Sequence, residues 1–187
     1  MQALARAVSL VFNPMVYATL YCAFFSWRGR DPRAWAAPWC LIVAIPAALL
    51  FAGLRLGWWS DPDVTALAER RTYLPWAATS AALGAAVALA SRAPYAVRLS
   101  ALAIALWLAA SAAVSQFWKV SLHVGGTTGV VGLLWLLAGP ASGAALLWTP
   151  LLVGWARLRL RRHDLGQVVG GIALGTAAVV AAHALLA

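Results

Sequence analysis

The residues that could do chemistry gather in two short stretches of the chain. The first reads Lys119-Val120-Ser121-Leu122-His123-Val124-Gly125-Gly126 and holds the only lysine of the sequence. A hydroxyl, an imidazole and backbone amides at the start of a predicted helix, beside a fixed positive charge, suit phosphate binding. The second stretch carries Arg157, His163 and Gln167 at steps of six and four residues. A basic stretch such as this usually binds lipid headgroups, but the pairing of Arg157 and His163 with the first stretch favours a shared phosphate site.

The elements that must position these residues are membrane helices. The chain has 187 residues, 64% apolar side chains and a mean hydropathy of +0.83. Only 10% of its residues are charged, against about 25% in an ordinary soluble domain. Apolar stretches recur along the whole length and there are only two cysteines, which excludes a soluble enzyme, a disordered tail and a disulfide-rich secreted scaffold. We expect an all-α, polytopic membrane bundle that forms a single domain over residues 1–187.

Charged residues and interfacial tryptophans bound the apolar runs, and these limits predict seven membrane spans. The spans cover about residues 7–27, 35–57, 74–91, 99–118, 122–139, 142–158 and 165–186. Gly139-Pro140 separates the short fifth and sixth spans, and six spans is the alternative count. With seven spans, the loops near residues 60–72, 119–121 and 157–164 emerge on the side of the N-terminus. One membrane interface then collects both reactive stretches and most of the charge.

The excess of positive charge can be explained in a membrane protein by contacts with lipid headgroups and phosphates. Fourteen lysines and arginines against five acidic residues give a formal charge of +9. Cations that flank membrane helices meet anionic headgroups or lipid phosphates, and the chain lacks the basic and aromatic interleaving of single-strand binders, so no nucleic-acid partner is expected. Arg159, Arg161 and Arg162 have the pattern of headgroup-binding cations. His183 lies about 30 Å beyond His163 along a helix and cannot join the cluster.

The order and spacing of these residues resemble the type 2 phosphatidic-acid phosphatase family, whose three motifs read K-x6-R-P, P-S-G-H and S-R-x5-H-x3-D. The stretch from Arg157 through His163 to Gln167 is similar to the third motif, with Ala156 in place of serine and Gln167 in place of aspartate. The resemblance covers about residues 60–175. It rests on the order of the motifs and on their shared membrane interface.

The other two motifs are kept less completely. Ser121-Leu122-His123 retains the serine and histidine of the second motif. Asp63-x6-Arg70-Arg71 retains the arginine of the first motif but has Asp63 for its lysine and Arg71 for its proline.

The resemblance implies a metal-independent lipid phosphatase that needs no cofactor. His163 would attack the phosphoryl group to give a phosphohistidine, and His123 would protonate the departing alkoxide. The resemblance assigns the clamping of the nonbridging oxygens to Arg70, Arg71 and Arg157, with further hydrogen-bond donors from Ser121 and the neighbouring amides.

Two departures from the family motifs lead to hypotheses about this chain. Lys119 can restore the ammonium that the first motif lacks. Gln167 can accept a hydrogen bond from the His163 ring, but as a neutral group it cannot stabilise an imidazolium as an anion would. Asp164 or Asp63 would supply the missing negative charge.

Three other classes of membrane protein are alternatives to a phosphatase. A magnesium-dependent prenyltransferase or phosphotransferase of lipid metabolism would need repeated aspartates, and Asp61-Pro62-Asp63 is the only close pair. A transporter or channel would carry ionisable or helix-breaking groups near the bilayer midplane. A non-catalytic lipid-phosphate-binding or scaffold protein stays open as the second reading.

The expected partners are a lipid phosphate as substrate and the lipids of the surrounding membrane. Polyprenyl phosphate or diphosphate is favoured by the breadth of the family and by the absence of extramembrane sequence that would select a headgroup. Phosphatidic acid and phosphatidylglycerophosphate are the other substrates considered. Divergent prokaryotic members of the family show a similar glutamine at the end of the third motif, which places the expected protein in a prokaryotic cell membrane.

Overall fold

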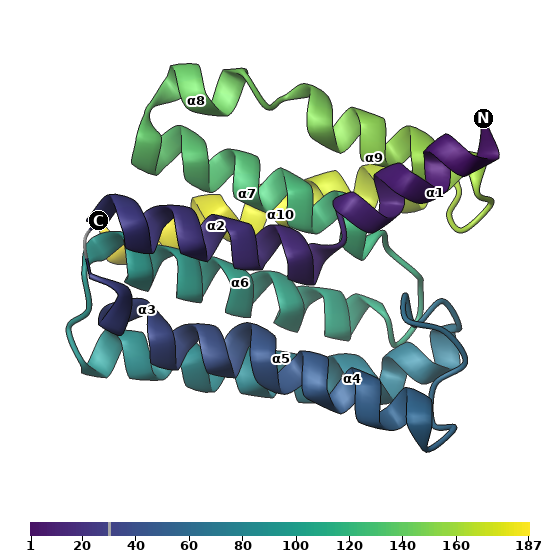
Figure 1. Cartoon of the computed structure of the whole chain (residues 1–187), viewed down its shortest axis with the longest axis horizontal. Coiled ribbons are helices and arrows are strands. Elements are labelled where there is room, and N and C mark those ends of the chain that lie inside the picture. Colours follow the sequence, from purple (N-terminus) through teal and green to yellow (C-terminus); the bar gives the residue numbers. More distant parts are fainter. Residues whose placement is uncertain (30) are drawn as a thin grey trace.

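The computed structural model describes residues 1–29 and 31–187, and every regular element in these ranges is helical (Figure 1). The elements are, in chain order, α1 (Gln2–Val11), α2 (Pro14–Gly29), α3 (Pro32–Trp39), the π-helical turn η1 (Cys40–Ala44), α4 (Ile45–Arg55), α5 (Leu67–Ala90), α6 (Tyr95–Val114), α7 (Leu122–Ala138), α8 (Pro140–Ala144), α9 (Trp148–Arg159) and α10 (Leu165–Leu186). The predicted all-α class is confirmed for the described residues.

Several of these helices have the length and hydropathy of membrane spans. Four helical segments qualify, which are Pro32–Arg55, Leu67–Ala90, Tyr95–Val114 and Leu165–Leu186. The pair α1 and α2 qualifies as a fifth when it is taken as one span bent by 45°. The described chain is therefore a helical protein with four or five candidate membrane spans, fewer than the seven or six expected from the sequence.

Proline-marked breaks account for much of this difference. α1 ends before Pro14, and Asn13 Oδ1 accepts a hydrogen bond from the Met15 backbone N–H at 3.0 Å as α2 begins. The predicted span at 142–158 is divided into α8 and α9, and Pro150 stands in the first turn of α9. Proline is tolerated in a first helical turn because the N–H groups there have no intrahelical partner. Each break leaves segments too short to qualify alone.

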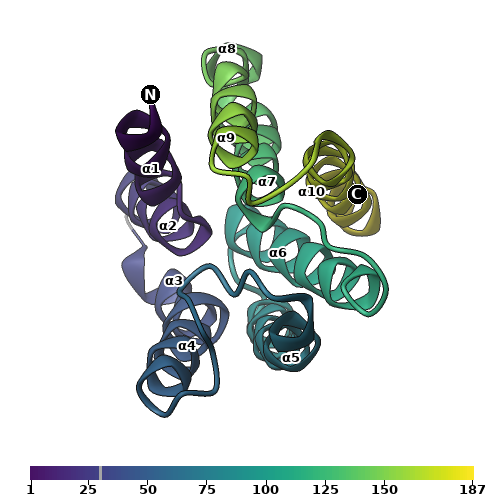
Figure 2. The same cartoon turned by 90° about the vertical axis from the view of Figure 1, so that its right-hand side faces the viewer.

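The loops that carry the reactive residues meet at one end of the bundle. The N-terminus and the loops before α5, α7 and α10 lie at the right-hand end in Figure 1, and the C-terminus lies at the other end. Figure 2 looks onto this end and shows the three loops side by side. The expectation that these loops share a side with the N-terminus is confirmed.

Glycines allow α7 and α10 to cross at very short range. α7 carries Gly125 and Gly129, and α10 carries Gly171 and Gly175. A Cβ atom added to Gly175 would lie 2.4 Å from the Gly125 carbonyl oxygen, and one added to Gly171 would lie 2.6 Å from the Ser121 carbonyl oxygen. Small residues four apart let helix backbones approach in this way in membrane bundles. The crossing brings the starts of α7 and α10 together at the loop-bearing end.

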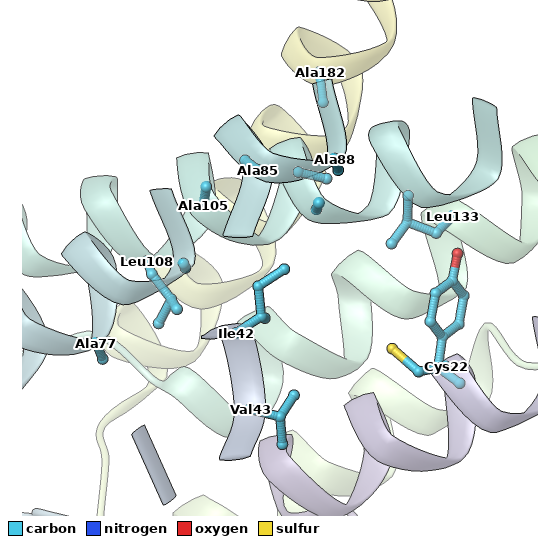
Figure 3. Close-up of a cluster of buried hydrophobic side chains, with 14 of the residues drawn as sticks. Cys22, Ile42, Val43, Ala77, Ala85, Ala88, Ala105, Leu108, Leu133 and Ala182 are labelled. Atoms are coloured by element: carbon cyan, nitrogen blue, oxygen red, sulfur yellow. The ribbon is translucent and has the colours of Figure 1, made fainter. Parts of the chain in front are cut away.

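The interior of the bundle is built from small apolar side chains. Alanines on α5, α6 and α10 face one another around Ile42 and Leu133 (Figure 3). Their small volume lets neighbouring helices pack closely, as expected where apolar lipid competes with apolar packing. This dry core supports the polar groups at one end and contains none of them.

Candidate functional site

Arg157 is the centre of the polar cluster at the loop-bearing end. It lies in the last turn of α9, and its side chain is 0% exposed. Its Nη1 donates to Ser9 Oγ and to Asp63 Oδ2, both at 2.7 Å. Its Nε and Nη2 are buried and have no hydrogen-bond partner among the described residues. This free edge is the fork with which arginine binds two oxygens of a phosphate or carboxylate.

Asp63 connects Arg157 to His123. It lies in the loop between α4 and α5, where Oδ2 accepts from Arg157 and Oδ1 is 3.6 Å from His123 Nε2. Burial acts to raise the pKa of Asp63, but His123 and Arg157 together act more strongly and hold that pKa below its ordinary value. Asp63 is therefore an ionised carboxylate that faces an imidazole and a guanidinium.

Arg70 hydrogen-bonds to two loops beside the cluster, the loop before α5 and the loop before α7. It is 1% exposed, and it donates from Nε to the Val64 carbonyl at 2.7 Å and from Nη1 to the Val120 carbonyl at 2.6 Å. Arg71 follows it on α5 but is exposed, because adjacent side chains on a helix point about 100° apart. The structure thus brings Arg70 to the site as predicted and leaves Arg71 outside it.

The start of α7 supplies His123 and Ser121. Ser121 is the buried N-cap of α7, and its Oγ accepts from the Val124 backbone N–H at 3.4 Å. Its own backbone N–H donates to the Gln167 carbonyl at 3.0 Å, which links the starts of α7 and α10. His123 is 4% exposed, and its Nε2 has no hydrogen-bond partner in the described part of the chain.

His163 is held in one orientation by a chain of hydrogen bonds. Its Nδ1 lies 2.8 Å from Gln167 Oε1, which confirms the contact expected from their spacing. Gln167 Nε2 donates to Asp164 Oδ2 at 2.9 Å, and Asp164 Oδ1 caps α10 by accepting from the Gln167 backbone N–H. Because a carboxylate only accepts, it orients the amide so that Oε1 faces the imidazole. Nδ1 of His163 then carries the proton, and the lone pair is on Nε2.

The free nitrogen of His163 has the properties of a nucleophile. The side chain is 7% exposed, and Nε2 is buried with no hydrogen-bond partner in the described residues. Burial and the positive charge of Arg70 lower the pKa of His163 to about 3, against the opposing effect of the hydrogen bond to Gln167. The imidazole is therefore uncharged at neutral pH, which is the form that can attack phosphorus.

Lys119 and Arg162 lie at the rim of the cluster. Lys119 is half-buried, and its Nζ donates to the Arg162 carbonyl at 2.7 Å. Arg162 in turn donates from Nη1 to Thr65 Oγ1 at 3.0 Å. These contacts join the loops before α5, α7 and α10. The neighbouring cations Arg159 and Arg161 are exposed, as expected for headgroup-binding residues.

Two contributions to the site were missed from the sequence. Ser9 is a single hydroxyl in an apolar run, 148 residues from the arginine that it contacts, and no local pattern marks it. Of the two carboxylates expected to supply charge to His163, Asp164 or Asp63, Asp63 instead contacts His123 and Arg157. The acidic residue whose hydrogen bonds lead to His163 is Asp164, and it acts through the amide of Gln167.

An apolar cavity of about 100 Å³ adjoins the polar cluster. Asp63 and His123 lie at its wall, and its other lining side chains, such as Leu74, Ile104 and Trp107, come from α2, η1, α4, α5 and α6. Apolar surface thus lies directly beside the two polar residues.

Comparison of the chain with protein-family models, with curated proteins and with solved structures finds no match. In the described residues, no three side chains of His, Cys, Asp or Glu are grouped as metal ligands. His183, as predicted, is remote from the site, and its Nδ1 hydrogen-bonds the Tyr95 hydroxyl at 2.7 Å.

Proposed function

We propose that the protein is a metal-independent membrane lipid phosphatase, a divergent relative of the type 2 phosphatidic-acid phosphatases. One observation carries the proposal: Nε2 of His123, Nε2 of His163, and Nε and Nη2 of Arg157 are buried without partners among the described residues. Leaving buried polar groups unpaired costs on the order of 1–3 kcal/mol for each group, and more for charged ones. A phosphoryl group supplies oxygens for the donors and an electrophile for the nucleophilic nitrogen.

The chemistry follows from the roles of these nitrogens. In the first step, the lone pair on Nε2 of His163 forms a bond to phosphorus as the bond from phosphorus to the lipid oxygen breaks. Protonated His123 gives its proton to that oxygen, so the lipid leaves as an alcohol. In the second step, water attacks phosphorus, His123 takes a proton from the water, and the nitrogen–phosphorus bond breaks to release phosphate. The Arg157 fork holds two nonbridging oxygens throughout.

The chain of contacts from Asp164 through Gln167 supports the role of His163. In the family motif, an aspartate stands at the position of Gln167 and would contact the nucleophile directly. Here Gln167 Oε1 lies 2.8 Å from His163 Nδ1, and Asp164 holds the amide. The negative charge of Asp164 is thus connected to the imidazole that becomes positively charged as the phosphohistidine forms.

We further propose that α7 and the α8–α9 pair complete a bundle of seven passes in a prokaryotic cell membrane, with the site at one interface. The apolar cavity beside Asp63 and His123 would receive the first part of the lipid tail. Its apolar lining suits the tail of any of these lipids. A polyprenyl phosphate or diphosphate is the favoured substrate on the breadth of the family, ahead of phosphatidic acid and phosphatidylglycerophosphate.

Phosphate release by the purified protein in detergent tests the proposal with each of these lipids. We expect turnover in the wild type and a loss of at least about 10³-fold in His163→Ala. His183→Ala is the matched control, because it removes the same side chain at the other end of the bundle, and it should retain activity. A fully active His163→Ala variant would refute the phosphohistidine. Lipid phosphate binding without release would favour the non-catalytic alternative.

A further inference from the structure

Asp63 contacts two residues that the proposed mechanism uses for different purposes. Oδ2 binds Arg157, which clamps phosphate, while Oδ1 faces Nε2 of His123, which donates the proton. We propose that Asp63 is a positioning residue that faces His123 with a negative charge, and so favours the form of the ring that acts as general acid on a poor leaving group. This inference rests on the proposed lipid phosphatase function.

The charges around His123 explain why such a carboxylate is needed. The charged side chains that act on its ring are Arg157 from α9, Arg70 from α5 and Asp63, and the backbone of Ser9 in α1 lies beside it. Burial and two guanidinium groups disfavour a proton on the imidazole, and Asp63 is the carboxylate that opposes them in the described part of the site. Removal of Asp63 would leave His123 without the negative charge that favours protonation of its ring.

The separation between the two groups leaves the proton available. Nε2 of His123 is 3.6 Å from Asp63 Oδ1, which is within ion-pair range but longer than a hydrogen bond. The carboxylate can therefore stabilise the imidazolium charge while the N–H is free to turn to a leaving oxygen. The hydrogen bond from Arg157 to Oδ2 holds the other side of the carboxylate.

The loop around Asp63 is built to hold this position. Asp61 Oδ1 accepts from the Asp63 backbone N–H at 2.9 Å, and Asp61 Oδ2 accepts from Thr65 through its backbone N–H and its hydroxyl. Val64 has a left-handed backbone with φ of 45°, and Arg70 binds its carbonyl. A valine in this conformation is strained, so the surrounding contacts determine the loop geometry. The charged groups that face Asp63 itself are His123, Arg157 and Arg162.

Substrates with different leaving groups can distinguish this role of Asp63 from a purely structural one. A lipid alkoxide needs a general acid, whereas p-nitrophenolate leaves without one. For Asp63→Asn, which keeps the shape of the side chain, we expect kcat on lipid phosphate to fall about 10²-fold and kcat on p-nitrophenyl phosphate to change less than about threefold. The basic limb of the pH profile for the lipid substrate should also move to lower pH. Asp63→Glu should restore part of the lipid activity.

A control variant and the second substrate show which explanation each outcome supports. Asp31→Asn makes the same change at the opposite end of the bundle, where Asp31 caps α3, and it should leave both activities unchanged. An equal loss on both substrates in Asp63→Asn would show that Asp63 acts through Arg157 or the fold, and an unchanged lipid activity would show no role. Either result would overturn this inference and leave the proposed lipid phosphatase function standing. A wild type that releases phosphate from neither substrate would overturn the proposed function and this inference with it.

Discussion

The two ends of the helical bundle carry the same kinds of charged residue but differ in how deeply these residues are buried. At the loop-bearing end, Arg70 and Arg157 are 1% and 0% exposed and His163 is 7% exposed. At the opposite end, Arg28, Arg33, Arg92 and His183 are exposed, while Arg98 is half-buried and its buried Nε has no hydrogen-bond partner among the described residues. A membrane protein can anchor both ends with exposed cations, but burial of a charge is costly unless it is paired.

The difference between the ends lies in the loops and helix crossings that surround the charges. At the loop-bearing end, Arg70 and Lys119 join three loops, and the glycine crossing draws α7 against α10. At the other end, a short turn joins α5 to α6, and the Tyr95 contact to His183 lies at the surface. Only the loop-bearing end groups several buried and unpaired nitrogens in the described part of the chain, on His123, His163 and Arg157, and the following predictions test this contrast.

Arg157→Ala should have the largest effect on both stability and turnover. It leaves Asp63 and Ser9 without their buried partner, so we expect a loss of about 3–5 kcal/mol of stability and at least about 10²-fold in kcat/KM. Arg157→Lys keeps the charge but loses the two-donor edge and should recover stability more than turnover. Thermal unfolding in detergent and phosphate release measure the two effects. Arg92→Ala is the matched control, and an equal effect there would remove the contrast between the ends.

Gly175→Ala should separate α7 from α10. The new Cβ would meet the Gly125 carbonyl oxygen, a backbone atom that cannot turn aside, so we expect a destabilisation of about 1–3 kcal/mol. Gly166→Ala lies on the same helix, where the nearest atom would be 3.4 Å away, and it should be neutral or stabilising. Melting temperatures of the two variants decide the matter. Equal values would show that the crossing does not depend on glycine.

His163 should link the stability of the protein to pH. The pKa of His163 is about 3 in the folded protein and 6.5 in its ordinary state, so between these values the unfolded chain binds more protons. Stability should therefore fall as the pH is lowered through this window, with His163 contributing about 1–2 kcal/mol between pH 7 and pH 5. His163→Gln should flatten the pH dependence of the melting temperature. A steeper profile in His163→Gln would contradict the assignment.

Lys119→Met should have the smallest effect of the four. Its ammonium is half-buried and bound to the Arg162 carbonyl at the rim, so we expect KM for lipid phosphate to rise about fivefold, or about 1 kcal/mol. Arg28→Met is the comparison at the other end and should leave KM unchanged. Unchanged kinetics in Lys119→Met would refute the idea that Lys119 replaces the missing lysine of the first motif.

Contacts between residues close in sequence were the part of the site that could be predicted. His163 and Gln167 are four residues apart across the start of a helix, so their contact follows from helical geometry. The shared side of the three loops followed from the alternation of apolar runs and charges. Ser9 and the partners of Asp63 could not be found in this way, because each contact joins distant segments whose approach depends on packing.

The breaks in the helices could also not be predicted from the hydropathy pattern of the sequence. The chain is apolar on both sides of Pro14, and a hydropathy average over this window does not register the bend of 45° between α1 and α2. That bend is part of what carries Ser9 to Arg157. The split between buried Arg70 and exposed Arg71 likewise depends on the rotation of α5, which neighbouring helices determine.

Composition and spacing alone determined that this protein is helical and apolar, and that its reactive residues share one end. These properties follow from the sequence because bilayer thickness and helical rise are constants that any apolar run must meet. Only the tertiary structure decided which cations are buried, which carboxylate faces which histidine, and which nitrogens stay unpaired. Those properties depend on helix rotation and loop geometry, which arise from contacts between residues up to 148 positions apart.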